Sequence, residues 1–113
     1  MTRKAVVVLL LLLASAWHVS AAENKGAESI TLDGGERGAV QFPHRRHQAK
    51  LEDCNLCHKL FPKQPGAIDR LKKEGQLKPK QVMNQLCLKC HRAEKRAGHK
   101  AGPVICSKCH HKG

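Results

Sequence analysis

The pentapeptide Cys-x-x-Cys-His occurs three times in this chain of 113 residues, at 54–58, 87–91 and 106–110, and its copies use all six cysteines. This spacing is typical of covalent c-type haem attachment, in which two thiols form thioether bonds to the vinyl groups of one porphyrin. The histidine after the second cysteine then lies beneath the iron as its proximal ligand. The sequence therefore predicts three haem c groups, attached through Cys54, Cys57, Cys87, Cys90, Cys106 and Cys109, with His58, His91 and His110 as proximal ligands.

Two other uses of paired cysteines are open to such a chain. A zinc site can be built from Cys-x-x-Cys pairs, and an oxidising compartment permits structural disulfides. Neither explains why a histidine follows the second cysteine of each pair three times over. The pattern favours haem attachment over both alternatives.

The first 22 residues predict a secretory signal peptide. Arg3 and Lys4 precede an unbroken apolar run over residues 5–14, and small residues follow up to Ala22. The run is shorter than the roughly 20 apolar residues that span a bilayer, so an uncleaved anchor is the weaker alternative. We therefore expect an exported, periplasmic protein whose domain covers residues 23–113.

The domain that remains is poor in core-forming side chains. Its 91 residues contain only two aromatic side chains, Phe42 and Phe61, and carry 19 basic against 9 acidic residues. A chain of this size needs disulfides, a metal or a large cofactor to become stable. This composition excludes an unaided globular enzyme with a deep substrate pocket, and three porphyrins would supply the missing aromatic surface.

The expected secondary structure is short and sparse. Alternating residues at 30–32 and 40–42 flank the turn sequence Asp33-Gly34-Gly35, which predicts a two-stranded hairpin. One or two helical turns are expected within 44–53, a loop at 59–66, and a weak helix around Ile68 and Leu71. Another helix is expected to begin at Pro79, whereas 92–105 reads as a basic, Gly-containing segment outside any long element. The predicted fold class is a small, mostly irregular α protein with a short N-terminal β-hairpin.

Three irons need three further axial ligands if each is six-coordinate. The histidines outside the pentapeptides and the signal peptide are His44, His47, His99 and His111. His44 and His47 are three residues apart, so a helical turn would place them on one face, within reach of two neighbouring haems. We expect this pair to bind iron rather than to be a solvated surface pair.

The hairpin, the sequence Val40-x-Phe42-Pro43-His44-x-x-His47 and the attachment motifs resemble the class III multihaem cytochromes c. The 28 residues between His58 and Cys87 hold no cysteine, where the tetrahaem members, cytochromes c3, carry their second attachment site. The pattern over about residues 30–112 is therefore similar to the trihaem cytochrome c7 type. The resemblance implies a fold organised around three haems, with Phe42 among the cofactor-binding residues. It also implies that His44 binds the haem of Cys54 and Cys57, and His47 that of Cys87 and Cys90.

The resemblance also exposes a departure at the remaining ligand. The family's distal histidine for the last haem lies four residues before the second attachment site present here, and that position is Met83. A thioether is a legitimate haem ligand and raises the reduction potential relative to histidine. The alternatives are Met83 as a gap-filling apolar residue, His99 or His111 as the ligand, or a five-coordinate iron. We expect Met83 to bind the haem of Cys106 and Cys109.

Six-coordinate irons leave no open position for substrate, so the sequence predicts one-electron transfer between redox partners rather than catalysis. A metal- or oxyanion-reducing protein that uses a labile methionine ligand is the alternative, and a haem sensor would need an output domain. The formal charge of the 91-residue domain is +10, and it falls to about +4 when the six propionates of three haems are counted. A basic charge can indicate nucleic-acid binding, but an exported chain without stacking aromatic side chains does not suit that partner. We expect a monomer without a membrane span after signal cleavage, whose partners are redox proteins or periplasmic or extracellular acceptors. Basic residues near the last two motifs are candidates for a docking patch.

Overall fold

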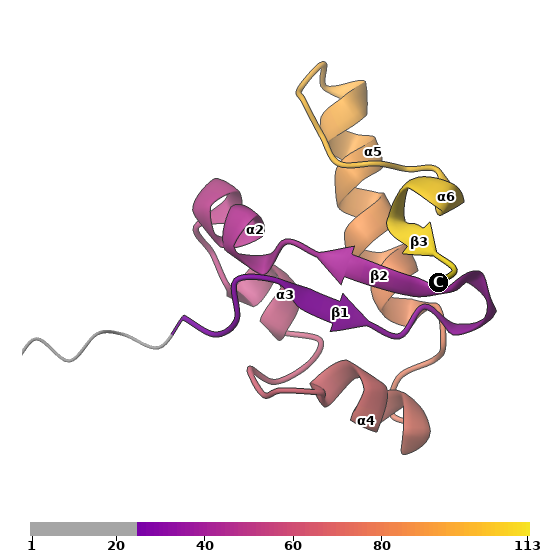
Figure 1. Cartoon of the computed structure of the whole chain (residues 1–113). Coiled ribbons are helices and arrows are strands. Elements are labelled where there is room, and N and C mark those ends of the chain that lie inside the picture. Colours follow the sequence, from indigo (N-terminus) through magenta and orange to yellow (C-terminus); the bar gives the residue numbers. More distant parts are fainter. Residues whose placement is uncertain (1–24) are drawn as a thin grey trace, which may run out of the picture.

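The computed structural model describes residues 25–113, so the predicted signal peptide lies outside the described residues. The described chain is mostly helical or irregular, with one small sheet (Figure 1). Its elements, in chain order, are β1 (Ile30–Leu32), the 3₁₀ turn η1 (Gly35–Arg37), β2 (Ala39–Phe42), α2 (His44–Leu51), α3 (Asn55–His58), α4 (Ala67–Lys73), the π-helical segment η2 (Met83–Cys87), α5 (Leu88–Arg96), α6 (Cys106–Cys109) and β3 (His110–His111). This arrangement confirms the predicted fold class.

The N-terminal hairpin has the strands and the turn that the sequence predicts. β1 and β2 are antiparallel, with Ile30 opposite Phe42 and Leu32 opposite Val40. The turn between them is stabilised locally, because the Asp33 carboxylate accepts a hydrogen bond of 2.8 Å from the backbone N–H of Gly35. Such Asx turns are a common use of aspartate before glycine.

A third strand, which the sequence analysis did not predict, makes the sheet larger than a hairpin. β3 pairs antiparallel with β2, so the strand order is β1-β2-β3, and Val40 lies opposite His110. A Cβ atom at Gly38 would lie within 3.0 Å of backbone atoms of His111 and Lys112. The pairing of β3 with β2 therefore depends on a glycine at position 38. A strand of two residues is too short to leave a periodic signal in the sequence.

Two of the helices before the second pentapeptide were predicted, whereas α3 and the length of α5 were not. α2 and α4 lie where they were expected. α5 continues η2 without a break to Arg96, so residues 92–96 are helical, although the sequence analysis expected no long element there. Arg, Ala, Glu and Lys are good helix formers, and Lys95 and Arg96 in the last turn favour the helix dipole. The chain leaves the helix at Gly98, whose φ is +81°.

Within residues 25–113 the buried hydrophobic side chains are only Ala67, Leu71 and Leu77. All three belong to α4 and the turn that follows it, which Figure 1 shows on the opposite side of the hairpin from α5 and α6. The regions around the three pentapeptides have no buried side chain of their own, and Leu56 and Ile105 within or beside them are exposed. No helix among the described residues is long and apolar enough to cross a membrane.

Candidate functional site

Each pentapeptide lies on a helical turn that brings its two cysteines together. Cys54 precedes α3, which contains Cys57, and α6 begins at Cys106 and ends at Cys109. Cys87 ends η2, and Cys90 follows in the first turn of α5. Residues three apart on a helix lie on nearly the same face, which is the arrangement that two thioether bonds to one porphyrin require. All six thiols are free in the structure.

The three pentapeptides also lie close to one another. Burial raises the pKa of the Cys87 thiol, and the neighbouring thiols Cys57 and Cys109, which belong to the other two motifs, raise it further. Burial likewise raises the pKa of Cys57, with a contribution from Cys90. Because a thiol senses another only at short range, Cys87 of the second motif lies near a thiol of each of the other two motifs. Porphyrins attached at these cysteines would be neighbours.

Five histidines share one hydrogen-bonding pattern, in which ring atom Nδ1 donates to a backbone carbonyl. A carbonyl only accepts, so this bond assigns the ring proton to Nδ1 and leaves the lone pair of Nε2 free for a metal. The bonds are His44 to Ala27 at 2.8 Å, His47 to Pro43 at 2.9 Å, His58 to Phe61 at 3.2 Å, His91 to Pro103 at 2.8 Å and His110 to Gly38 at 3.0 Å. These five are the histidines that the sequence predicts as iron ligands.

Four of these histidines form two facing pairs. The ring centres of His44 and His58 are 6.3 Å apart with planes at 83°, and those of His47 and His91 are 6.2 Å apart with planes at 27°. A metal–nitrogen bond is about 2 Å and the nitrogen lies roughly 1 Å from the ring centre, so two imidazoles across one iron have centres roughly 6 Å apart. Both pairs have the spacing that a shared iron requires, and they match the pairing that the family resemblance implies.

The two phenylalanines lie against these histidines. The Phe42 ring centre is 4.3 Å from that of His47 and 6.0 Å from that of His44, so Phe42 lies beside both candidate distal ligands. Phe61 meets His58 edge-on, with ring centres 5.1 Å apart, and also provides the carbonyl that accepts the His58 ring proton. The sequence analysis missed Phe61 as a site residue, although its position three residues after His58 and the scarcity of aromatic residues were visible signals.

His110 faces no second histidine ring among the residues that the structure describes. The second ligand of the third iron therefore has to be sought among Met83, His99 and His111. Met83 is half-buried at the start of η2, one helical turn before Cys87, whose thiol lies near Cys109. His99 is exposed over 64% of its side chain, and its Nδ1 is 2.8 Å from the Glu94 carboxylate. His111 is exposed at the edge of the sheet. Met83 as the ligand stays a prediction.

Glycines make room for two of the proximal histidines. A Cβ atom at Gly102 would lie within 3.0 Å of three ring atoms of His91, and one at Gly34 would lie equally close to the ring of His110. The absence of a side chain at these positions is therefore a steric requirement of the histidine rings. The sequence analysis did not identify either glycine.

The residues present fit three haems. The five histidine rings have Nε2 free, the cysteines lie in pairs, and exposed apolar residues such as Leu56 and Ile105 border the motifs where side-chain packing is missing. Among residues 25–113 no group of three or more His, Cys, Asp and Glu side chains converges as a protein-only metal site would require. These features define a multihaem c-type cytochrome.

The comparisons with known proteins agree with this class. A family model described as "Cytochrome c7 and related cytochrome c" matches residues 40–111. A cytochrome c7 from Geobacter metallireducens is 34% identical over 86 residues, which are 76% of this chain and 78% of the relative. A solved structure titled "PpcC, A cytochrome c7 from Geobacter sulfurreducens" is 36% identical, covers 77% of this chain and 100% of its own, and superposes with a TM-score of 0.46.

The chain belongs to the cytochrome c7 family. It is accordingly a multihaem c-type cytochrome of electron transfer that carries three covalently bound haem c groups. Three such groups need six cysteines, which is the number that the sequence contains.

Proposed function

We propose that this protein is a periplasmic carrier that moves single electrons between redox partners and does not itself transform a substrate. The observation that carries the proposal is the pair of facing histidine couples, with ring centres 6.2 and 6.3 Å apart. An iron held between two imidazoles has no open position for substrate, whereas its one-electron reduction needs none. The chemistry that the haems supply is this reversible exchange of one electron.

The same geometry supports the proposed ligand assignment. The first haem, attached at Cys54 and Cys57, has His58 and His44 as axial ligands, with Phe42 and Phe61 beside the rings. The second haem, attached at Cys87 and Cys90, has His91 and His47. In both pairs the backbone carbonyls fix the orientation of the rings and increase their electron donation to a metal. We expect low potentials for these two haems.

The third haem, attached at Cys106 and Cys109, has His110 as its proximal ligand and Met83 as its distal ligand. Supporting this assignment, Met83 lies one turn before Cys87, and Cys87 neighbours Cys109. Since a thioether donates less electron density than an imidazole, this haem has the highest potential of the three. A methionine–iron charge-transfer band in the oxidised protein tests the assignment, and its absence would contradict it.

Export is the part of the proposal that rests on the sequence alone. Residues 1–22 have the basic start, apolar run and small-residue exit of a signal peptide. N-terminal sequencing of the protein recovered from the periplasmic fraction should begin within one or two residues of Glu23. Recovery of a full-length chain from the membrane fraction would instead indicate an anchor.

The partners are proposed to be acidic redox proteins or anionic acceptors. Six basic side chains near the last two pentapeptides are all exposed: Lys89, Lys95, Arg96, Lys100, Lys108 and Lys112. Charge complementarity acts mainly on the association rate, so electron transfer to the true partner should slow as ionic strength rises. A rate that is independent of salt would remove this docking patch from the proposal.

A second function is favoured by one observation: within residues 25–113 no second imidazole ring faces His110 as His44 faces His58 or His47 faces His91. A labile methionine would let this haem bind and reduce a metal ion or an oxyanion. Carbon monoxide added to the reduced protein separates the two functions. An unchanged spectrum supports the carrier, and a change equivalent to one haem in three supports the reductase.

A further inference from the structure

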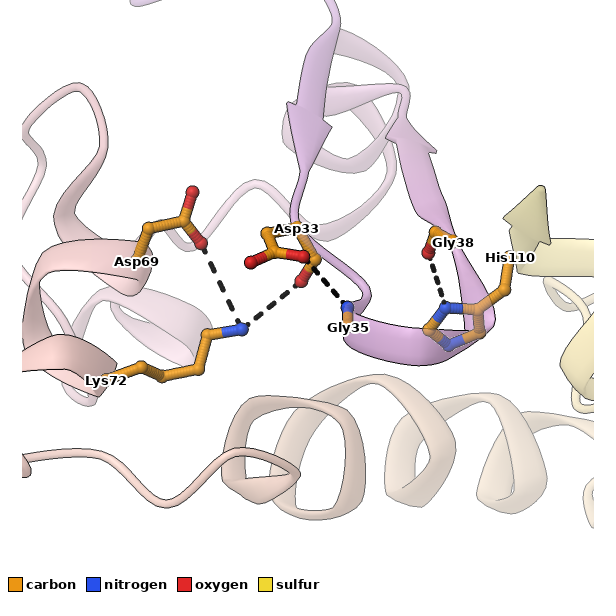
Figure 2. Close-up of polar contacts among 6 residues, drawn as sticks. All are labelled: Asp33, Gly35, Gly38, Asp69, Lys72 and His110. Atoms are coloured by element: carbon orange, nitrogen blue, oxygen red, sulfur yellow. Dashed lines mark hydrogen bonds and ion pairs between the residues drawn. The ribbon is translucent and has the colours of Figure 1, made fainter. Parts of the chain in front are cut away.

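The proximal ligand of the third haem is held by the turn of the N-terminal hairpin, far from it in sequence. The Nδ1–H of His110 donates to the carbonyl oxygen of Gly38 over 3.0 Å, across 72 residues of chain. On the other side of the turn, Gly34 lies so close to the His110 ring that a Cβ atom there would overlap it. Figure 2 shows the ring of His110 facing the carbonyl of Gly38. The position of this ring therefore depends on the shape of the 33–38 turn.

Two polar contacts fix the shape of that turn. The Asp33 carboxylate accepts from the Gly35 N–H at 2.8 Å, and the Gly38 N–H donates to the Gly35 carbonyl at 3.0 Å. From outside the turn, the ammonium of Lys72 on α4 donates to the backbone carbonyl of Asp33 at 3.2 Å (Figure 2). Lys72 is the link between the turn and α4, 39 residues further along the chain.

The surroundings of Lys72 show why its ammonium stays there. Its side chain is 21% exposed, and Oδ1 of Asp69 lies 4.0 Å from Nζ. That oxygen is shielded from solvent and accepts no hydrogen bond within the described chain, so the ammonium is its nearby counter-charge. A shielded carboxylate oxygen keeps a cation close, because separating them would leave a charge uncompensated. Lys72 is thus held between Asp69 and the Asp33 carbonyl.

We propose that Lys72 is a positioning residue for His110, which holds the 33–38 turn so that the Gly38 carbonyl meets the ring proton of the third haem's proximal ligand. This inference rests on the proposed role of His110. A hydrogen bond from Nδ1–H makes the imidazole a stronger electron donor and stabilises ferric iron. Loosening the turn weakens that bond, and the potential of the third haem rises.

The sign of this shift separates positioning from charge. Removal of a nearby positive charge lowers a haem potential, because the extra electron of the ferrous state loses a favourable interaction. The double variant Asp69→Asn with Lys72→Met leaves the net charge unchanged and removes the contact to Asp33. In the fully haem-loaded protein, a redox titration followed by NMR of each haem's methyl signals should show the third potential raised and the other two unmoved. An unchanged or lowered third potential overturns the proposal.

Two further variants test the lysine itself. Lys72→Arg keeps both the charge and a donor for the Asp33 carbonyl, so the third potential should stay at the wild-type value. Lys73→Met removes the exposed neighbouring ammonium without touching the turn, so it should not raise the potential. A rise in either variant would contradict the proposal. Hydrogen exchange at the Gly38 amide should accelerate about fivefold in the double variant, as expected when one hydrogen bond is lost.

A second pair of variants keeps the test sharp if the double variant folds poorly. Asp33→Ala and Asp33→Asn remove the same charge from an exposed side chain, but only Asn can still accept the Gly35 N–H. The third potential should be higher in the alanine variant than in the asparagine variant, and equal potentials would refute the role of the turn. If His110 were not a ligand, the wild-type NMR spectrum would itself lack iron-shifted His110 ring signals. Failure of the present proposal leaves those signals in place.

Discussion

Replacing Gly102 with alanine tests whether the His91 ring packs directly against the backbone at position 102. A methyl group there would lie closest to Cε1 of His91, 2.6 Å from Nε2 and 2.9 Å from Nδ1. Carbon contacts are favourable at about 3.5–4.0 Å, so the ring or the backbone would have to move by more than about 1 Å. The same movement strains the 2.8 Å hydrogen bond from His91 to the Pro103 carbonyl.

The expected free-energy change has a definite sign. Gly102 is not among the glycines with positive φ, so alanine fits its backbone and would by itself stabilise the protein by about 0.4–1 kcal/mol. Overpacking costs about 1–3 kcal/mol, which leaves a net destabilisation of about 1–2 kcal/mol. For a domain of this size that corresponds to a fall in Tm of about 5–15 °C.

The assay is thermal unfolding of the haem-loaded protein, combined with a redox titration resolved by haem. The Gly102→Ala variant should unfold at a lower temperature, and the second haem alone should shift to higher potential because His91 donates less electron density. Gly113→Ala is the matched control, since a Cβ atom there meets nothing within 4 Å. A raised Tm, or a second potential identical to that of the wild type, would refute the packing of His91 against Gly102.

Three shorter predictions address the ligands and the cofactors. Met83→His should lower one of the three potentials, abolish the methionine–iron band and leave the other two potentials nearly unchanged. His99→Ala and His111→Ala should each leave three six-coordinate haems, because His99 pairs with Glu94 at the surface; loss of a ligand signal in either would transfer the assignment to that residue. Mass spectrometry of the mature protein should show three added haems. The chain produced without haem attachment should give the circular dichroism spectrum of a largely unfolded protein, because its core is sparse. A cooperative unfolding transition of the haem-free chain would contradict this reasoning.

Covalent chemistry was the most predictable part of this molecule. The residue types and spacing of the cysteine pairs and of the histidines that follow them predict haem attachment. Asp33 and the glycines after it predict the hairpin turn. The facing arrangement of His44 with His58 agrees with what the family resemblance implied. These features are local in sequence or carried by rare residue types, so the sequence alone exposes them.

The less predictable part consists of contacts made by the backbone. The hydrogen-bond acceptors for the five histidine rings are backbone carbonyl oxygens, which every residue possesses. Residue type therefore does not identify Pro103 or Gly38 as an acceptor. β3 forms because the C-terminal residues meet the N-terminal hairpin beside Gly38, and only the tertiary structure brings these two segments together. The length of α5 was missed because residues 92–105 were described only by their basic and glycine content. The Arg, Ala, Glu and Lys residues at 92–96 have high helix propensity and extend the helix.

The placement of the small core at α4 has a consequence for how the protein matures. The buried side chains Ala67, Leu71 and Leu77 all lie in α4 and the turn after it, and none of them neighbours a cysteine in sequence. Among the described residues around the pentapeptides no hydrophobic side chain is fully buried, and Cys54, Cys90 and Cys106, one from each pair, are exposed. We therefore expect each attachment site to be accessible before haem is attached, and the regions around the pentapeptides to become rigid only when the porphyrins are in place.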